Sequence, residues 1–288
     1  MNRRAETADF LRGRRADLTP DRAGLPTDDR VRRVPGLRRD EVARLAGVST
    51  EYYTRLEQGR ASNPSPAVIE GLARALQLDA SEREHLTDLM SGPQPARRSP
   101  AAPQRVRSGL QLMLQTLDHV PAFILGRRTD VLASNRLARA VLTDFEALPA
   151  PRRNLARFYL LDPAARERTV AWERIAAETV AVLRLEAGRY PHDRQLADLV
   201  GELTLQSPEF TDWWHDHRVL RRTHGTKHYR HPLVGDLEFS YESLQPPGDS
   251  DQTLCVYNVE PGSATAAALR TLDSWTVPLT PARQGATT

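Results

Sequence analysis

The stretch RRDEVARLAGVSTEYYTRLEQG, residues 38–59, decides the fold of the first part of this chain. Val42 and Leu45 recur at helical spacing and predict a short helix that ends at Gly47, because glycine adopts the positive φ of a tight turn. Ser49 then predicts the start of a second helix, since its hydroxyl can accept a hydrogen bond from the first turn of backbone. We therefore expect two short helices joined by a tight turn.

The second predicted helix has a buried face and an open face. Tyr53 and Leu56 share the buried face, and Gly59 marks the end of the helix. A helix-turn-helix of this kind places the N-terminal, outward residues of its second helix against base edges in the major groove of DNA. Arg55 can pair with guanine, and Glu51 can accept a hydrogen bond from cytosine. The segment therefore predicts sequence-specific binding of double-stranded DNA.

Arginines at the start of the first helix predict a different kind of contact. A guanidinium there can bind phosphate, which supplies salt-dependent affinity without reading the sequence. The alternative is a helical hairpin within a bundle, in which Glu51 and Arg55 form only a surface pair. The combination of turn glycine, capping serine and Glu57 before the final glycine favours DNA binding. The candidate DNA-binding residues are Arg38, Arg39, Ser49, Thr50, Glu51, Tyr52 and Arg55.

Helical periodicity is interrupted most clearly by a proline-rich stretch at residues 91–104. Before it, five short amphipathic segments without a strand pattern predict an all-α, five-helix domain over residues 1–90. The stretch contains four prolines and predicts a linker. After it we expect a mixed domain over residues 105–275 and a disordered tail over residues 276–288. The predicted fold class is therefore α+β with two domains.

Strand and helix patterns alternate in the second predicted domain. AFIL at residues 122–125 and VLAS at residues 131–134 predict two strands, and Asn135 is placed to cap the helix that follows. Phe239 and Tyr241 alternate with polar residues, which predicts a strand with one wet face. The string TLCVYNV is apolar on both faces and predicts a covered central strand. We expect these strands to form one sheet.

Composition excludes several classes of protein. The chain has 288 residues, 40% of them hydrophobic and 27% charged, a balance typical of a folded chain. No stretch is apolar enough to span a bilayer and the start lacks an apolar signal core, so we expect a cytoplasmic protein without membrane contact. Cys255 is the single cysteine, which excludes an internal disulfide. The net charge of +3 is small, so the local cluster of five arginines without an acidic residue at residues 30–39 carries the DNA prediction.

Two parts of the sequence resemble known families. LAGVSTEYYTRLEQG resembles the Xre and Cro type of repressor domain. The second half is similar to regulators that join such a domain to a MmyB-like ligand-binding domain, on the strings PAFILGRRTDVLASN, RNLARFYLLDP, HGTKHYRHPLVGDL and QTLCVYNVEPGS. The resemblance runs from Phe10 to Leu272. It implies a PAS-like antiparallel sheet, covered by helices, that holds a small and largely apolar ligand, with a fatty-acid-like molecule as our guess.

The sequence departs from that family's pattern at two positions. Ser134 stands where a tryptophan is usual, and Ala171 replaces the usual aspartate before Trp172. A serine in place of a tryptophan is expected to enlarge or reshape a pocket. Ser207 before Pro208 predicts a helix on which Trp214 and His217 align. For each ligand candidate the alternative is a filled core. The candidates are Phe123, Leu125, Trp172, Trp214, His217, Phe239, Tyr241 and Tyr257.

The histidines raise a second hypothesis, a metal-dependent enzyme domain fused to a DNA-binding head. His215 and His217 are two apart on a predicted helix and point to different faces, and no carboxylate completes a metal motif. We therefore predict no enzyme activity, cofactor, catalytic residue or metal ligand. A third hypothesis is a dimerisation module without a ligand. A homodimer is expected in any case, because an operator of two-fold symmetry mirrors a two-fold protein.

Overall fold

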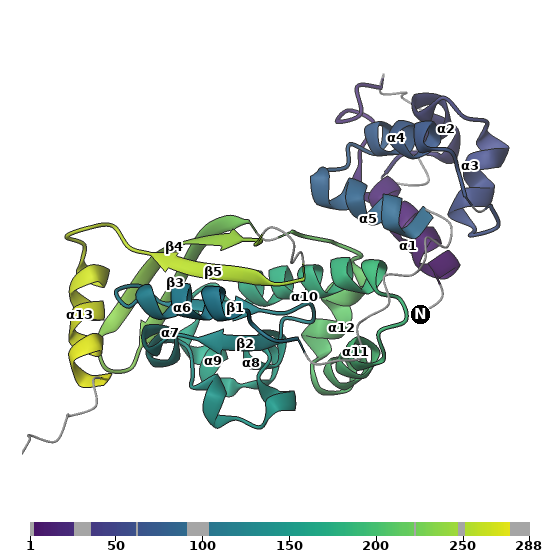
Figure 1. The fold of residues 1–288 in the computed structure, drawn as a ribbon. Coiled ribbons are helices and arrows are strands. Elements are labelled where there is room, and N and C mark those ends of the chain that lie inside the picture. The colour runs from purple at the N-terminus through teal and green to yellow at the C-terminus, as the bar shows by residue number, and fades with distance from the viewer. Residues whose placement is uncertain are drawn as a thin grey trace, which may run out of the picture. The chain divides into compact units, whose positions relative to one another are not determined.

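The computed structural model forms two compact units (Figure 1). The first joins Met1–Pro103 to Glu173–Arg222, and the second joins Gln104–Trp172 to Thr223–Thr288. The predicted linker lies outside the described residues except for Gln104, as does the predicted tail except for Thr276, and the division into domains at residues 91–104 stays a prediction. The described residues are 3–25, 36–61, 63–90, 104–221, 223–246 and 251–276.

The first unit begins with the five expected helices. Their bounds are α1 Arg3–Asp17, α2 Arg39–Ala46, α3 Thr50–Glu57, α4 Pro66–Ala75 and α5 Ala80–Met90. A capping box lies at the start of α5: the Glu82 N–H donates to Asp79 Oδ1 at 2.8 Å, and the Asp79 N–H donates to Glu82 Oε2 at 3.0 Å. These local bonds fix where the helix begins.

Helix α2 turns a narrower face to the core than the sequence predicts. Val42 and Ala43 are buried, whereas Leu45, expected inside, is 37% exposed. The reason is the rotation of the helix: Val42, Ala43 and Ala46, at i, i+1 and i+4, share the inward arc and leave Leu45 at its edge. On that inward side α2 approaches α4 closely, since a Cβ added to Gly71 would lie 2.5 Å from the Ala46 carbonyl oxygen.

Three further helices complete the described part of the first unit: α10 Trp172–Arg189, of which Trp172 belongs to the second unit, α11 Arg194–Gln206 and α12 Pro208–His215. Ser207 caps α12 as predicted, because its Oγ accepts a hydrogen bond from the Phe210 N–H at 3.1 Å. The prediction that this helix continues to His217 is wrong. The helix ends at His215, and His217 has a φ of 52°. The left-handed backbone there breaks the helical alignment with Trp214.

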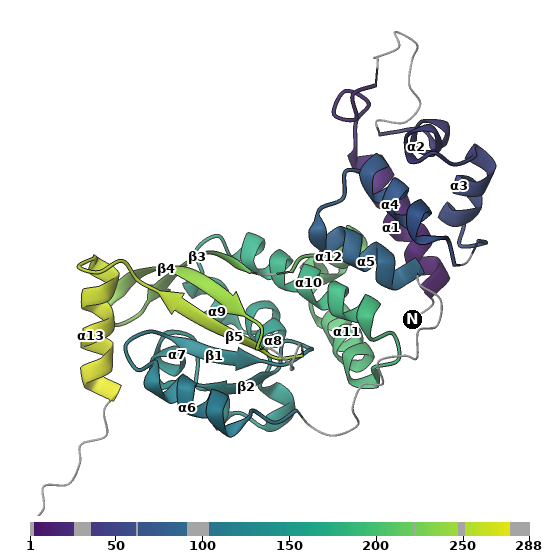
Figure 2. The same cartoon turned by 45° about the horizontal axis from the view of Figure 1, so that its top comes forward.

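The second unit is a mixed α and β structure. Its sheet has the strand order β2-β1-β5-β4-β3, and every strand pair is antiparallel (Figure 2). The strands are β1 Ala122–Leu125, β2 Val131–Ser134, β3 His224–His231, β4 Gly235–Leu244 and β5 Thr253–Asn258. The helices are α6 Ser108–Thr116, α7 Arg136–Val141, α8 Leu155–Leu161, α9 Pro163–Arg168 and α13 Ala264–Thr276, with 3-10 turns at Phe145–Ala147 and Ala150–Arg152.

The sheet confirms the strand predictions. Strand β5 lies at the centre, as its two apolar faces predict, and β4 alternates between buried and exposed residues. Strand β3 has Lys227, Tyr229 and His231 at its inward positions, two of which are basic. Its period-two pattern therefore shows in burial and not in hydropathy.

Asn135 connects three elements of the second unit. It caps α7 as predicted, with Oδ1 accepting from the Ala138 N–H at 2.9 Å and from the Ala122 N–H at 3.1 Å. Its amide nitrogen donates to the carbonyls of Leu117 at 2.6 Å and Val120 at 2.7 Å. One side chain thus joins the chain after α6 to the start of β1 and of α7.

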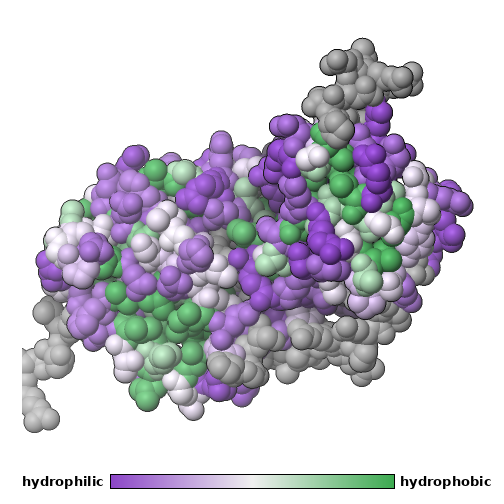
Figure 3. Space-filling model, turned by 90° about the horizontal axis from the view of Figure 1, so that it is seen from above, coloured by the Kyte–Doolittle hydropathy of each residue, from purple (hydrophilic) through white to green (hydrophobic). Residues whose placement is uncertain are grey.

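Hydrophilic surface predominates on the face seen in Figure 3, with smaller hydrophobic areas between. No helix in the described ranges has both the length and the apolarity that crossing a bilayer requires. The large apolar side chains that are exposed are scattered over several elements, which is ordinary for a folded protein.

His85 of α5 is a buried titratable group in the first unit. Its ring is fully buried and packs edge to face on Phe10 at 5.1 Å between centroids. Within the described residues neither ring nitrogen has a hydrogen-bond partner. Burial, together with repulsion from Arg184 and His217, lowers the pKa of His85 to about 3.

We predict that this unit loses stability as the pH falls below about 6.5. Folded His85 stays neutral down to about pH 3, whereas the unfolded chain takes up a proton near pH 6.5. The free energy of unfolding should therefore fall by about 1.4 kcal/mol per pH unit between these values. His85→Leu should flatten the slope in urea titrations, and exposed His215→Leu should not. An equally steep slope in His85→Leu would contradict this assignment.

Candidate nucleic-acid interface and ligand-binding face

The helix-turn-helix has the local geometry that its sequence predicts. Gly47 ends α2 with a φ of 71°, and the Val48 N–H donates to the Ala43 carbonyl at 3.0 Å. Ser49 caps α3, since its Oγ accepts from the Tyr52 N–H at 3.1 Å. The turn glycine and the capping serine therefore act where the sequence places them.

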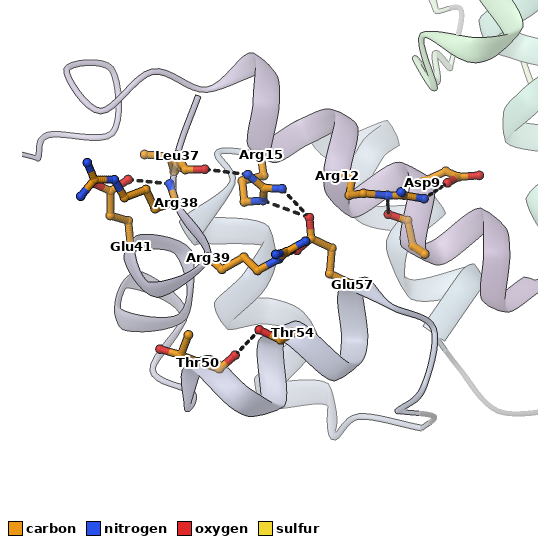
Figure 4. A network of polar contacts seen from close by, with 11 residues as sticks. Asp9, Arg12, Arg15, Leu37, Arg38, Arg39, Glu41, Thr50, Thr54 and Glu57 are labelled. Atoms are coloured by element: carbon orange, nitrogen blue, oxygen red, sulfur yellow. Dashed lines mark hydrogen bonds and ion pairs between the residues drawn. The ribbon is translucent and has the colours of Figure 1, made fainter. Parts of the chain in front are cut away.

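A buried carboxylate joins the three helices that frame this motif. Glu57 of α3 has a fully buried side chain and accepts hydrogen bonds from Arg15 of α1 and Arg39 of α2 (Figure 4). Arg15 donates from Nε at 3.0 Å and from Nη2 at 2.7 Å to Oε1, and Arg39 donates from Nε at 2.5 Å to Oε2. Arg15 also donates to the Leu37 carbonyl at 2.8 Å. The orientation of α3 is thereby fixed against both neighbours.

The two arginines predicted to bind phosphate have different surroundings. The Arg39 side chain is 47% exposed and is held by Glu57. The Arg38 guanidinium points away from that pair (Figure 4), while the backbone N–H of Arg38 donates to Glu41 at 2.6 Å. Arg38 can therefore reach a phosphate without giving up an ion pair with Glu57, and Arg39 would share its guanidinium between the two.

The outward residues of α3 are not equally open. Thr50, Glu51 and Arg55 are exposed, and no ion pair joins Glu51 to Arg55 among the described residues. Tyr52 is half-buried and packs against the hydrophobic core. The exposed cap Ser49 uses its Oγ within the helix. Three side chains of the predicted set thus combine exposure with unused base-reading groups.

Sequence reasoning missed Arg15 and gave Glu57 no structural role. The available signal was the spacing of Glu57 four residues after Tyr53, which puts a carboxylate on the buried face of the helix. A buried carboxylate requires a charged partner, but the spacing does not say which arginine supplies it.

In the second unit, predicted ligand residues gather on one face of the sheet. Phe123, Tyr257, Phe239 and Tyr241 come from β1, β5 and β4, and all four are buried. The Tyr257 ring lies 5.4 Å from Phe123, 5.5 Å from Phe239 and 6.2 Å from Tyr241 between centroids. We call these four residues the aromatic face. The opposite face packs against α6 through Leu110 and Leu114.

A chain of phenol hydroxyls borders the aromatic face. The Tyr159 hydroxyl lies 2.6 Å from that of Tyr229, which lies 3.2 Å from that of Tyr257. Burial raises the pKa of Tyr229 well above its usual value, and its two tyrosine neighbours raise it further. The Tyr229 hydroxyl is therefore neutral near pH 7. Tyr159 and Tyr229 were not among the predicted residues.

The other ligand candidates lie in separate places. Leu125 is buried on β1, and Trp172 donates from Nε1 to the Tyr159 carbonyl at 2.6 Å, so both belong to the second unit. Trp214 and His217 belong to the first unit. There the Trp214 ring stacks on Phe210 at 5.3 Å and lies under the Arg184 guanidinium at 4.3 Å.

Ser134, the departure noted in the sequence, lies in the wall of a pocket. The pocket has a volume of about 370 Å³ and is lined by α6, the end of β2 and α7. None of the eight predicted ligand residues lines it. In the described part of the chain, no group of three or more His, Cys, Asp or Glu side chains could hold a metal ion.

Comparison with known families assigns both halves of the chain. A helix-turn-helix domain family matches residues 6–86, and the MmyB-like transcription regulator ligand binding domain matches residues 106–272. No curated protein matches this chain. The two family matches thus define a DNA-binding transcription regulator with a ligand-binding domain. The chain belongs to the family that carries the MmyB-like ligand binding domain, which confirms the resemblance seen in the sequence.

We predict that Glu57→Gln destabilises the helix-turn-helix by about 3 kcal/mol, because breaking a buried ion pair leaves Arg15 without its carboxylate. Urea unfolding of the full chain, followed by hydrogen exchange of α2 and α3, measures the loss. The control is Glu51→Gln on the exposed side of the same helix, which should change stability by less than about 0.5 kcal/mol. Similar losses in the two variants would refute a special role for Glu57.

Proposed function

We propose that α3 reads DNA sequence through Thr50, Glu51 and Arg55. The observation that supports this most strongly is their shared exposure on a helix whose cap and orientation are fixed by Ser49 and by Glu57. Arg55 would donate to guanine, Glu51 would accept from cytosine, and Thr50 would contact a thymine edge. Tyr52 and Ser49 would support the helix and would also contact the DNA backbone.

Arg38 would bind phosphate, and Arg39 would do so to a smaller extent. Both lie at the start of α2, the helix that crosses the DNA backbone in this motif. Because Arg39 is already paired with Glu57, part of its charge is neutralised. These contacts would position the protein on the duplex and carry the salt dependence of binding.

The second unit would bind a small and largely apolar molecule at the aromatic face. Phe123, Phe239, Tyr241 and Tyr257 offer apolar ring surface, and the hydroxyls beside them offer hydrogen bonds. A site of mostly aromatic lining with a few oriented polar groups is typical of small-molecule binding. Entry of the ligand would require the packed rings to move apart.

The ligand would act by shifting a population of conformations. If it binds one arrangement of a homodimer better than the other, it changes the affinity for a two-fold operator by that difference. A coupling free energy of about 1–3 kcal/mol corresponds to roughly 5- to 150-fold in affinity.

Two arginine variants test the assignment of roles. Arg55→Ala should relax base preference at one operator position, with a loss of about 1–3 kcal/mol on the selected duplex and little on random DNA. Arg38→Ala should weaken binding to both and lower the salt slope by about 1. Fluorescence anisotropy on a duplex selected in vitro by the wild-type protein, at several salt concentrations, measures both. Equal losses on selected and random duplex for both variants would overturn the division of roles.

Native mass spectrometry of the full chain tests the ligand. We expect the purified protein to carry an apolar small molecule that is released on denaturation. Phe239→Trp adds bulk at the aromatic face and should reduce the bound fraction at least about threefold. Leu233→Trp, at a site that is 67% exposed, is the matched control and should leave it unchanged. A wild-type protein without any bound mass would count against ligand sensing at this face.

A further inference from the structure

The DNA-binding bundle shares its core with residues outside it. Leu185 of α10 and Val219 after α12 are 2% and 5% exposed, and both belong to the same hydrophobic cluster as Phe10 and Leu86. Residues more than 90 positions along the chain therefore complete the apolar interior of α1 and α5. This packing lies entirely within the first unit.

A buried ion pair reinforces this packing. Arg184 of α10 lies 3.4 Å from Glu6 of α1, and their side chains are 3% and 5% exposed. Arg184 also donates to the Trp214 carbonyl. Both charges are removed from water. Separating α1 from α10 would break the ion pair and leave each charge without a partner until water reached it.

One turn later, α10 approaches α5 closely. A Cβ added to Gly188 would lie 2.6 Å from two atoms of the His85 ring. The imidazole therefore lies directly against the backbone of α10, and only glycine leaves it room. Helix α10 continues past Gly188 to Arg189, so the role of this glycine is close packing.

Ion pairs between arginines and carboxylates lie at the edge of the contact between α10 and α5. They fix the position of α10 along α5. Arg189 pairs with Glu84 and with Asp88 at 3.8 Å, and Arg221 pairs with the same Glu84. The Arg221 N–H also donates to Ser81 Oγ at 2.9 Å. The carboxylates all come from α5, and the arginines all come from outside the bundle.

These contacts use α1 and α5 and leave the reading helix uncovered. Thr50, Glu51 and Arg55 of α3 are exposed while Glu6 and His85 are buried. We propose that α10 docks the DNA-binding bundle through Arg184, Leu185, Gly188 and Arg189, and so fixes α3 relative to α10 without blocking it. The docking rests on the proposed function only where α3 is taken to read DNA.

Pulsed electron spin resonance on the full chain tests the docking. Spin labels at Leu45→Cys and Leu205→Cys, which are 37% and 88% exposed, report the distance between the bundle and α11 in a Cys255→Ser background. We expect a narrow distance distribution in this labelled parent. Gly188→Ala should at least double its width, because the methyl group displaces the His85 ring. A broad distribution in the parent would overturn the proposal.

Three controls keep this result specific. Gly201→Ala makes the same change on α11, where nothing lies within 4 Å of the added Cβ, and should leave the distribution narrow. Gly188→Ala combined with His85→Ala should restore it, since the clash is removed. Arg189→Glu should broaden it by placing a carboxylate beside Glu84 and Asp88. Unchanged distributions in both Gly188→Ala and Arg189→Glu would refute docking through α10.

A measurement with bound DNA distinguishes two roles of α10: orienting the DNA-binding bundle, or blocking its DNA-binding surface. With a duplex selected in vitro by the wild-type protein, the labelled parent should keep its narrow distribution at saturating DNA. Broadening or a shifted mean distance on DNA binding would show that α10 must release the bundle, and would overturn the orienting role. If no duplex is selected, the proposed DNA reading fails, while the measurement without DNA still decides the docking.

Discussion

The carboxylate of Glu57 constrains the reading helix more than any other group described here. It is fully buried, and it receives hydrogen bonds from Arg15 of α1 and Arg39 of α2. Three helices are thereby tied at one point behind α3, whose opposite side carries Thr50, Glu51 and Arg55 toward solvent. A buried charge with two partners tolerates little displacement, because any movement exposes an uncompensated ion to a low dielectric. Precise presentation of base-reading side chains depends on such a fixed support.

In the second unit, ring packing and hydrogen bonds between hydroxyl groups take the place of a buried ion pair. Its aromatic face combines ring packing with a row of three phenol hydroxyls that bond to one another. Neutral hydrogen bonds cost less to rearrange than a buried ion pair, so the proposed ligand site is held by weaker polar contacts than the support behind α3.

Predictions from the sequence succeeded where local chemistry decides the outcome. The caps at Ser49, Asp79, Asn135 and Ser207 act on neighbouring backbone, so their spacing predicts them. Predictions went wrong or fell short where distant contacts decide. Leu45 is 37% exposed although its spacing groups it with Val42, and the inward positions of β3 include the basic residues Lys227 and His231. Neither fact can be read from a window of neighbouring residues.

The sequence by itself determined the class of fold, the helix-turn-helix and the family, because these depend on short-range periodicity, capping residues and motif strings. Only the tertiary structure decided which charges are paired, which rings share a face and which helix packs against the bundle. Arg15 is 42 positions from Glu57, and Arg184 is 178 positions from Glu6. The physical reason is that burial and pairing depend on packing between segments far apart in the chain, whereas caps and turns depend on the next few residues.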